Sequence, residues 1–270
     1  MSSHRSILRH LAHCALIFAV VLGLTAPAAI AGDTTTEAAA RALEEITWIT
    51  EQYPPFNFRD PEDGQIKGIC VDILLALFDT LGVRKTREDM TILPWARGYQ
   101  VVLEKPGTAI FSMTDTEERR NLFRLVGPVA PTQVSLLAKK SRKLKVESIA
   151  DMNGLRIGVI RDDVGDQLIR KLGLSSKAIH TKAAADNIVR MLFRDRLDAI
   201  AYADDIARHH TKLAGLDPSE LESVYVLMKS HMTYAFHRST DPAVLKVLQT
   251  ALDGLRVDGT VDRIRDQYLK

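Results

Sequence analysis

Hydrophobic and polar positions alternate between a strand period and a helix period along most of the chain after residue 45. Ile46–Thr50 is rich in β-branched and aromatic residues and is typical of a strand. Apolar residues in Val71–Phe78 recur at the spacing of one helix face, and Gly82 follows as a stop signal. The same reasoning predicts strands at Met90–Leu93 and Thr108–Phe111 and helices at Trp95–Leu103 and Thr116–Leu122.

A second set of elements follows a basic segment at residues 139–145. The predicted strands are Leu155–Ile160, Leu197–Tyr202 and Met232–Phe236, and the predicted helices are Val164–Lys171, Ile188–Phe193, Asp204–Lys212, Pro242–Leu255 and Thr260–Tyr268. This alternation of strands and helices favours the α/β class with mainly parallel sheets. In such sheets ligands gather at the carboxyl ends of the strands.

The first 31 residues have the features of a secretory signal. Arg5 and Arg9 precede a mostly apolar stretch at residues 11–24, and Ala29-Ile30-Ala31 has the small-x-small pattern of a cleavage site. The apolar stretch is shorter than the roughly 20 residues that a membrane-spanning helix needs. We therefore expect cleavage after Ala31, a periplasmic protein, and a loose leader or short helix at residues 32–44.

Charge and cysteine content exclude several classes of protein. Without Arg5 and Arg9 of the predicted signal, the chain has 34 basic and 34 acidic residues, whereas proteins that bind nucleic acid usually carry a basic excess. Cys70 is the one cysteine after the predicted signal, so we expect no internal disulfide. The sequence has no glycine-rich nucleotide loop and no spaced metal ligands, and we expect no cofactor, no metal and no nucleic acid partner.

Polar and aromatic residues that follow the predicted strands are candidates for a binding site. Tyr53, Trp95 and Ser112 each follow a strand and are expected on one rim of the sheet. The stretch SMTDTEERRN, residues 112–121, adds hydroxyls and two adjacent arginines. A guanidinium binds a carboxylate through two parallel charge-assisted hydrogen bonds, and free amides at a helix start favour anions. In the alternative interpretation, both arginines lie on a solvated helix face beside the two preceding glutamates.

An ordered series of motifs resembles the family 3 extracytoplasmic solute-binding proteins, the periplasmic receptors of polar amino acid ABC transporters. The motifs are YPPFNFRD (53–60), PWARGY (94–99), SMTDTEERR (112–120), LRIGVI (155–160), RLDAIAYADD (196–205) and LRVDGTVDRIRDQYLK (255–270). The resemblance covers residues 45–270. It implies a two-lobed periplasmic binding protein of type II, the Venus-flytrap architecture, whose lobes close on a ligand about two hinge crossings. The crossings are expected near Val134–Lys140 and His231–Arg238.

The resemblance also implies boundaries and site residues. Lobe 1 would combine residues 45–135 with 236–270, and lobe 2 would comprise residues 140–230. Thr114, Thr116 and Arg119 fit the family spacing Ser/Thr-x-Thr-x-x-Arg, so Arg119 rather than Arg120 resembles the arginine that holds a ligand carboxylate. Ser112 belongs to the same stretch. Aromatic residues of the family line the ligand at the positions of Tyr53 and Trp95.

The second lobe departs from the family pattern. Family members often hold the ligand ammonium with an acidic residue where this chain has Ala203, and Asp204 follows one position later as our candidate, with Asp205 behind it. The loop Arg161–Gly165 carries two acids where relatives have a Gly/Thr-rich loop. These departures suggest a ligand other than a standard amino acid, or different contacts in an open form.

The sequence thus predicts a monomeric periplasmic receptor, not an enzyme, that binds a small carboxylate-bearing solute and delivers it to an inner-membrane ABC permease. Two alternatives stay open. Cyclohexadienyl dehydratase-like enzymes share the fold, and Glu51 could act as a general acid if burial raised its pKa. A ligand-sensing module for a membrane partner is the other. His209, His210 and Cys70 are interpreted as structural residues.

Overall fold

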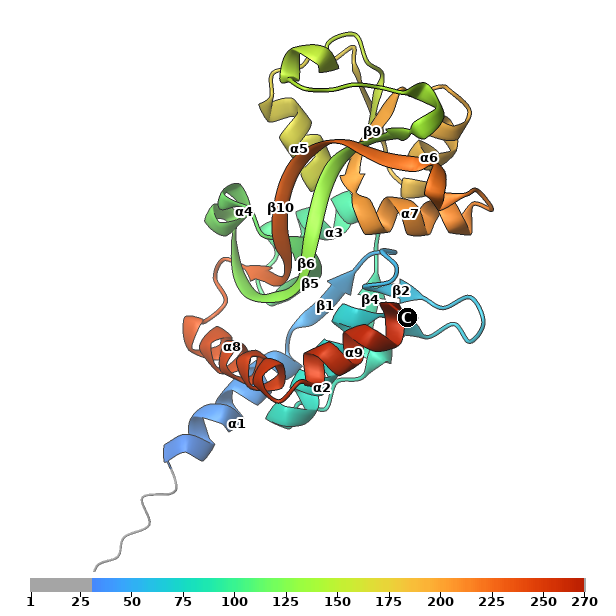
Figure 1. Cartoon of the computed structure of the whole chain (residues 1–270). Helices are drawn as coiled ribbons and strands as arrows, with labels where there is room; N and C mark the ends of the chain where they lie inside the picture. Colours follow the sequence, from blue (N-terminus) through green and yellow to red (C-terminus); the bar gives the residue numbers. More distant parts are fainter. Residues whose placement is uncertain (1–30, 270) are drawn as a thin grey trace, which may run out of the picture. The chain divides into compact units, whose positions relative to one another are not determined.

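The computed structural model describes residues 31–269, so the predicted signal up to Ile30 lies outside the described residues. Contacts divide the chain into two units, residues 1–35 and 36–270, and the fold concerns the second unit. Its helices are α1 (Ala31–Glu44, shared with the first unit), α2 (Ile69–Leu81), α3 (Trp95–Glu104), α4 (Glu117–Leu122), α5 (Val164–Lys171), α6 (Ala185–Phe193), α7 (Asp204–Leu213), α8 (Pro242–Val257) and α9 (Thr260–Leu269) (Figure 1). Its strands are β1 (Thr47–Thr50), β2 (Phe58–Arg59), β3 (Ile66–Lys67), β4 (Met90–Ile92), β5 (Thr108–Thr114), β6 (Phe123–Lys139), β7 (Ile157–Ile160), β8 (Ile179–Lys182), β9 (Ala199–Ala203) and β10 (Leu221–His237).

Eight strands of the described chain form one mixed sheet in the order β4-β1-β5-β10-β6-β9-β7-β8. β1 pairs in parallel with β4 and β5, and these three strands are called the first strand set. β7 pairs in parallel with β8 and β9, which form the second strand set. Both sets are flanked by helices in the α/β manner that the sequence predicts.

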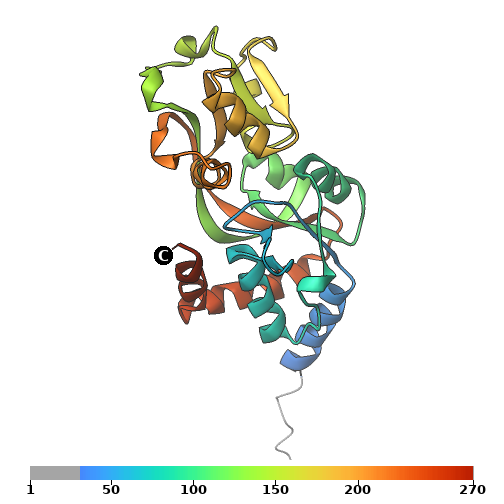
Figure 2. The same cartoon turned by 90° about the vertical axis from the view of Figure 1, so that its right-hand side faces the viewer.

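A long antiparallel pair, β6 with β10, joins the two strand sets (Figures 1 and 2). Each strand has 17 residues, far more than the short segment predicted at Met232–Phe236. β10 pairs with β5 at Met232–Phe236, whereas β6 pairs with β9 at Val134–Leu137. The chain therefore passes twice between the strand sets, as the predicted two-lobed architecture requires, and both passages run within these strands.

Helix α1 belongs to the folded core rather than to a loose leader. Ala39, Ala40 and Leu43 are buried in the largest hydrophobic cluster. The indole Nε1 of Trp48 donates a hydrogen bond to the carbonyl of Leu43 at 3.4 Å, and Trp48 itself is fully buried. Of the two forms expected for residues 32–44, the chain adopts the helix, and its apolar face holds it against the core.

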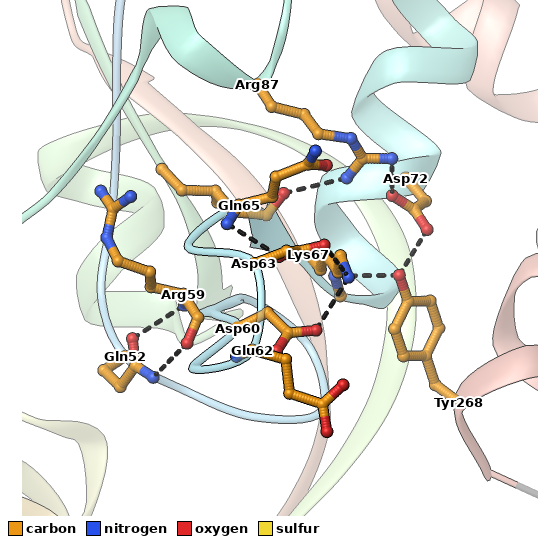
Figure 3. A network of polar contacts seen from close by, with 12 residues as sticks. Gln52, Arg59, Asp60, Glu62, Asp63, Gln65, Lys67, Asp72, Arg87 and Tyr268 are labelled. Atoms are coloured by element: carbon orange, nitrogen blue, oxygen red, sulfur yellow. Dashed lines mark hydrogen bonds and ion pairs between the residues drawn. The ribbon is translucent and has the colours of Figure 1, made fainter.

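A polar network fixes the loop between β1 and α2 (Figure 3). The Tyr268 hydroxyl of α9 donates to Asp72 Oδ2 at 2.5 Å and accepts from the Gly68 amide at 3.1 Å. Arg87 Nη2 lies 2.7 Å from Asp72 Oδ1. Gly68 has φ +128°, and a Cβ there would lie 2.4 Å from the carbonyl oxygen of Phe56. Only glycine allows this close approach, which sets the loop carrying Tyr53 against the start of α2.

Candidate functional site

Ser112 lies within β5 and not after it, so the predicted strand end is wrong. The register between β10 and β5 shifts at this point, because Thr233 pairs with Met113 and Tyr234 with Phe111. Ser112 is the extra residue, with φ +65°, which is the geometry of a β-bulge. The bulge turns its hydroxyl onto the side-chain oxygen of Asn57.

Asn57 connects Ser112 to the loop after β1 through hydrogen bonds. Its Nδ2 donates to the carbonyl of Glu51 at 2.8 Å, and its amide donates to the carbonyl of Tyr53 at 3.1 Å. Asn57 is fully buried, so these bonds are shielded from water. Ser112 is thereby a positioning residue for the loop that carries Tyr53, and its hydroxyl already has a protein partner.

The hydroxyl of Thr116 caps helix α4 by accepting a hydrogen bond from the Arg119 amide at 3.1 Å. The cap turns the chain sharply after β5. As a result the Arg119 side chain folds back, and its Nη1 donates to the carbonyl of Thr114 at 3.1 Å. Thr114 and Thr116 thus hold the backbone and side chain of Arg119 in place.

The two adjacent arginines have opposite environments. Arg119 is 0% exposed, and its Nε and Nη2 have no hydrogen-bond partner among the described residues. The side chain of Arg120 is 65% exposed and forms an ion pair with Asp115, with Nε and Nη2 each 2.7 Å from a carboxylate oxygen. The interpretation of both arginines as one solvated helix face does not fit this placement.

Aromatic rings surround the Arg119 guanidinium. Its central carbon lies 5.2 Å from the ring centroid of Trp95 and 5.7 Å from that of Tyr99, within the range of cation–π attraction. Burial lowers the pKa of Arg119, and the negative charge of Asp163 opposes that shift. Tyr53 also interacts electrostatically with this guanidinium, and each of the two groups affects the pKa of the other. Arg119, Trp95 and Tyr53 therefore lie in one group, as the sequence predicts.

Two contacts connect this group to the second strand set. Trp95 Nε1 donates to the carbonyl of Asp162, after β7, at 2.9 Å. The rings of Tyr53 and Tyr202, at the end of β9, meet edge to face with centroids 6.0 Å apart. Both tyrosines are buried. The candidate site therefore lies where elements of the two strand sets meet, as expected for a ligand enclosed between two lobes.

Two acids face this group, Asp163, which is buried, and Glu51, which is partly buried. Asp163, the residue before α5, is 6% exposed, and its Oδ2 has no hydrogen-bond partner in the described part of the chain. Burial raises the pKa of Asp163, and the Arg119 charge works against that rise. Burial and the Asp163 charge together raise the pKa of Glu51 well above its usual range. Neither acid was among the predicted ligand residues, although the sequence analysis named Glu51 as a candidate general acid and noted two acids in the loop that contains Asp163.

Asp204 does not join the Arg119 group. Its Oδ2 accepts a hydrogen bond from Gln133 of β6 at 3.0 Å. Burial raises the pKa of Asp204, and the charges that act on it are those of Arg208 and Asp205. The reason is its position, because Ala203 occupies the last residue of β9 and Asp204 is the first residue of α7. Its side chain turns toward the long strands.

A cavity of about 330 Å³ lies beside the aromatic group. It is lined by Glu51, Gln52, Ile92, Leu93, Pro94, Trp95, Ile160, Ala183, Ala184, Ala185, Asp186, Tyr202 and His210. Nδ1 of His210 lies 2.7 Å from Asp186 Oδ1, while its Nε2 is buried without a hydrogen-bond partner among the residues described. The pairing of His210 with a residue 24 positions earlier gave no local signal in the sequence.

Neither a cluster of metal ligands nor a membrane-spanning helix is found among the described residues. No group of three or more His, Cys, Asp or Glu side chains there is arranged to hold a metal ion. No helix within residues 31–269 has the length and apolar character needed to cross a bilayer.

Two α/β strand sets, two long connecting strands and a buried arginine where the sets meet define a two-lobed binding protein. Residues 46–270 match the bacterial extracellular solute-binding proteins of family 3, and the chain belongs to that family. The match covers all the elements after α1, including both strand sets and both long strands. The family assignment and the fold expected from the sequence motifs are thereby confirmed.

Similar proteins bind amino acids according to their descriptions. A probable histidine-binding protein of Neisseria gonorrhoeae is 22% identical over 220 residues, 80% of each chain. The structure of an ABC uptake transporter substrate-binding protein from Streptococcus pneumoniae with bound histidine has a TM-score of 0.73 and 18% identity, covering 88% of this chain and 96% of that one. An ancestral amino acid-binding protein, a precursor of cyclohexadienyl dehydratase, has a TM-score of 0.68 and 22% identity, covering 88% and 99%. At these identities the structures establish the fold.

Proposed function

We propose that the chain is a periplasmic receptor that binds a small carboxylate-bearing solute, an amino acid or a related molecule, between two lobes. It delivers this solute to an ABC importer and acts as a monomer. Residues 45–135 with 236–270 would form lobe 1, and residues 140–230 lobe 2. Arg119, with Tyr53 and Trp95, would contact the ligand, while Thr114, Thr116 and Ser112 hold the surrounding backbone.

The observation that carries the proposal is the unpartnered edge of the Arg119 guanidinium. Nε and Nη2 form one edge of an arginine side chain, and Arg84 uses this edge to hold both oxygens of Glu44 at 3.0 Å. Arg120 holds Asp115 in the same way. The same edge of Arg119 is buried and has no partner within residues 31–269. Because a buried charge is costly unless it is paired, a ligand carboxylate on this edge accounts for the arginine.

The experiment is a thermal-shift screen of amino acids and organic acids, using protein that has been unfolded, dialysed and refolded to remove any co-purified ligand. A ligand at 100 times its Kd stabilises the folded protein by about 2.7 kcal/mol. For a chain of this size that corresponds to a rise of roughly 5–11 °C in the melting temperature.

Arg119→Ala and Arg120→Ala form a matched pair for this screen. We expect Arg119→Ala to fold and to lose the ligand-induced shift, since the carboxylate loses both of its charge-assisted bonds. Arg120→Ala should keep the shift, because Arg120 is exposed and paired with Asp115. Equal shifts in Arg119→Ala and the parent would disprove the proposed site. Delivery to an importer is supported if permease and ATPase genes adjoin this gene.

One observation favours a second function, a dehydratase-like reaction. Glu51 has its pKa raised well above the usual range and lines the cavity beside the aromatic group, as a general acid would. Mass spectrometry of each stabilising compound after incubation separates the two functions. A receptor returns the compound unchanged. Conversion by the parent, lost in Glu51→Gln, would establish the enzyme instead.

A further inference from the structure

We propose that Asp163 recognises a cationic group of the ligand, so that the site selects a zwitterionic α-amino acid over a simple carboxylate. This inference rests on the proposed function, because it assumes that Arg119 holds the ligand carboxylate. It moves the acceptor for the ligand ammonium from the start of α7, where the sequence motif suggested Asp204, to the start of α5.

The contacts place Asp163 at the Arg119 group. The Arg119 guanidinium lies 5.2 Å from the centroid of the Trp95 ring. Trp95 Nε1 donates to the carbonyl of Asp162 at 2.9 Å, and Asp163 is the next residue. The loop before α5 is thus fastened to the ring that covers Arg119.

Packing behind the loop fixes its position. A Cβ at Gly165 would lie 2.1 Å from the carbonyl oxygen of Ala201, so α5 begins directly against β9. The amide of Gln167 donates to the carbonyl of Asp163 at 3.0 Å and closes the first helical turn. These contacts bury the Asp163 side chain and leave it little freedom to turn away from the site.

Asp163 and Arg119 face each other without forming an ion pair. No nitrogen of Arg119 comes within 4.0 Å of an Asp163 oxygen. Arg119 Nε and Nη2 and Asp163 Oδ2 are all buried, and all three are without a hydrogen-bond partner among the described residues. The two buried groups carry opposite charges and do not pair with each other, so a ligand that pairs with both would satisfy their unpartnered atoms.

The charge pattern selects the class of ligand. A monocarboxylate bound to Arg119 would bring a second negative charge beside Asp163, which is unfavourable in a buried site. An α-amino acid offers its carboxylate to Arg119 and its ammonium to Asp163, so that opposite charges alternate. Charge-assisted hydrogen bonds on both sides would then replace the water lost by each group.

Asp204 is less suited to this role. Its Oδ1 is also buried without a partner among the described residues, but Gln133 donates to its Oδ2, and neither Arg119 nor Asp163 is among the charges that shift its pKa. The end of β9, where relatives often have an acid, carries Ala203. Asp163 therefore supplies the carboxylate that the first half of the site lacks.

The test compares L-histidine with 3-(imidazol-4-yl)propanoate, its analogue without the α-amino group. Every other amino acid that binds the parent is likewise compared with its own deaminated analogue. Affinities are measured by isothermal titration calorimetry for the parent, Asp163→Asn, Asp162→Asn and Arg119→Ala. Asp162→Asn is the matched control, since Asp162 is the exposed neighbour of Asp163 and asparagine tolerates its positive φ.

We expect Asp163→Asn to bind the amino acid about 10- to 150-fold more weakly, the usual effect of losing a hydrogen bond to a charged group. The same variant should bind the deaminated analogue as tightly as the parent or more tightly, while Asp162→Asn should match the parent for both compounds.

A different role for Asp163 predicts the opposite change in amino acid affinity. If Asp163 only balances the charge of Arg119, Asp163→Asn will bind the amino acid and its analogue more tightly, and the inference is wrong. An unchanged affinity for the amino acid contradicts it as well. A parent that binds the deaminated analogue but no amino acid also contradicts the inference and leaves the proposed function standing. Full amino acid binding by Arg119→Ala contradicts the proposed function itself.

Discussion

The coupling between Arg119 and Asp163 in the ligand-free protein can be measured with a double-mutant cycle. The four proteins are the parent, Arg119→Met, Asp163→Asn and the double variant, chosen because methionine keeps most of the side-chain volume and asparagine keeps the shape. Urea unfolding at pH 7, with protein refolded free of ligand, gives the free energy of unfolding of each.

The structure sets the expected magnitude. The two charged groups are separated by more than 4.0 Å and make no hydrogen bond to each other. At an effective dielectric constant of 20, two unit charges at 4 Å interact by about 4 kcal/mol, and the energy halves at twice that distance. We therefore expect a favourable coupling of about 1–3 kcal/mol.

The single and double variants should differ in a characteristic way. Asp163→Asn leaves a buried guanidinium without its balancing charge and should lower the free energy of unfolding. The double variant removes both buried charges and should be as stable as the parent or more stable, by roughly 1–4 kcal/mol.

Two results would refute this reasoning. A coupling energy near zero would mean that the two side chains do not sense each other, and the alternating-charge argument for the ligand would fail. A double variant that is several kcal/mol less stable than the parent would mean that the pair serves the fold rather than the ligand.

Three further predictions follow from the same contacts. Trp95→Phe removes the hydrogen bond to the carbonyl of Asp162, and we expect ligand affinity to fall about 2- to 13-fold through loss of roughly 0.5–1.5 kcal/mol, measured by calorimetry. An unchanged affinity would show that this bond does not help the two strand sets to close. Glu51 has a raised pKa, so the folded state holds its proton to a higher pH than the unfolded state, and stability should fall as pH rises above about 4.5. Glu51→Gln should flatten that part of the pH profile in thermal melts, and an unaltered slope would contradict the assignment. Cys70 is buried with its pKa raised to about 12, so iodoacetamide at pH 8 should modify it only after unfolding, as mass spectrometry will report. Rapid modification of the native protein would show that the loop beside it opens.

The pattern of apolar residues predicted most helices because local spacing determines them. The predicted helix Val164–Lys171 agrees with α5 at both ends, and the glycine stop after α2 has the expected left-handed conformation at Gly82. The long strands were predicted only in part. Residues 222–231 of β10 are partly buried or exposed, so this part of the strand lacks the alternating or fully apolar pattern that marks a strand in sequence.

The candidate site likewise contains residues that local sequence predicts and residues that only the fold places. Arg119 was predictable because its helix cap, its threonines and its spacing all lie within six residues of sequence. Ser112 was misplaced because a β-bulge depends on the partner strand, where Thr233 pairs with Met113 from 120 positions later in the chain. The residues of the second strand set could be placed only by the fold. Nothing near Asp163 in the sequence indicates that it is buried beside an arginine 44 positions earlier.

The position of Asp163 changes the interpretation of the family pattern itself. The sequence suggested that the loss of an acid at Ala203 argues against an α-amino group on the ligand. That argument holds only if an ammonium acceptor must come from the end of β9. The loop before α5 approaches the same group of aromatic rings through Trp95, and α5 begins against β9 at Gly165. Because the loop after β7 and the end of β9 both reach the site, the proposed acceptor can lie on the loop before α5, and the ligand could then be zwitterionic despite Ala203.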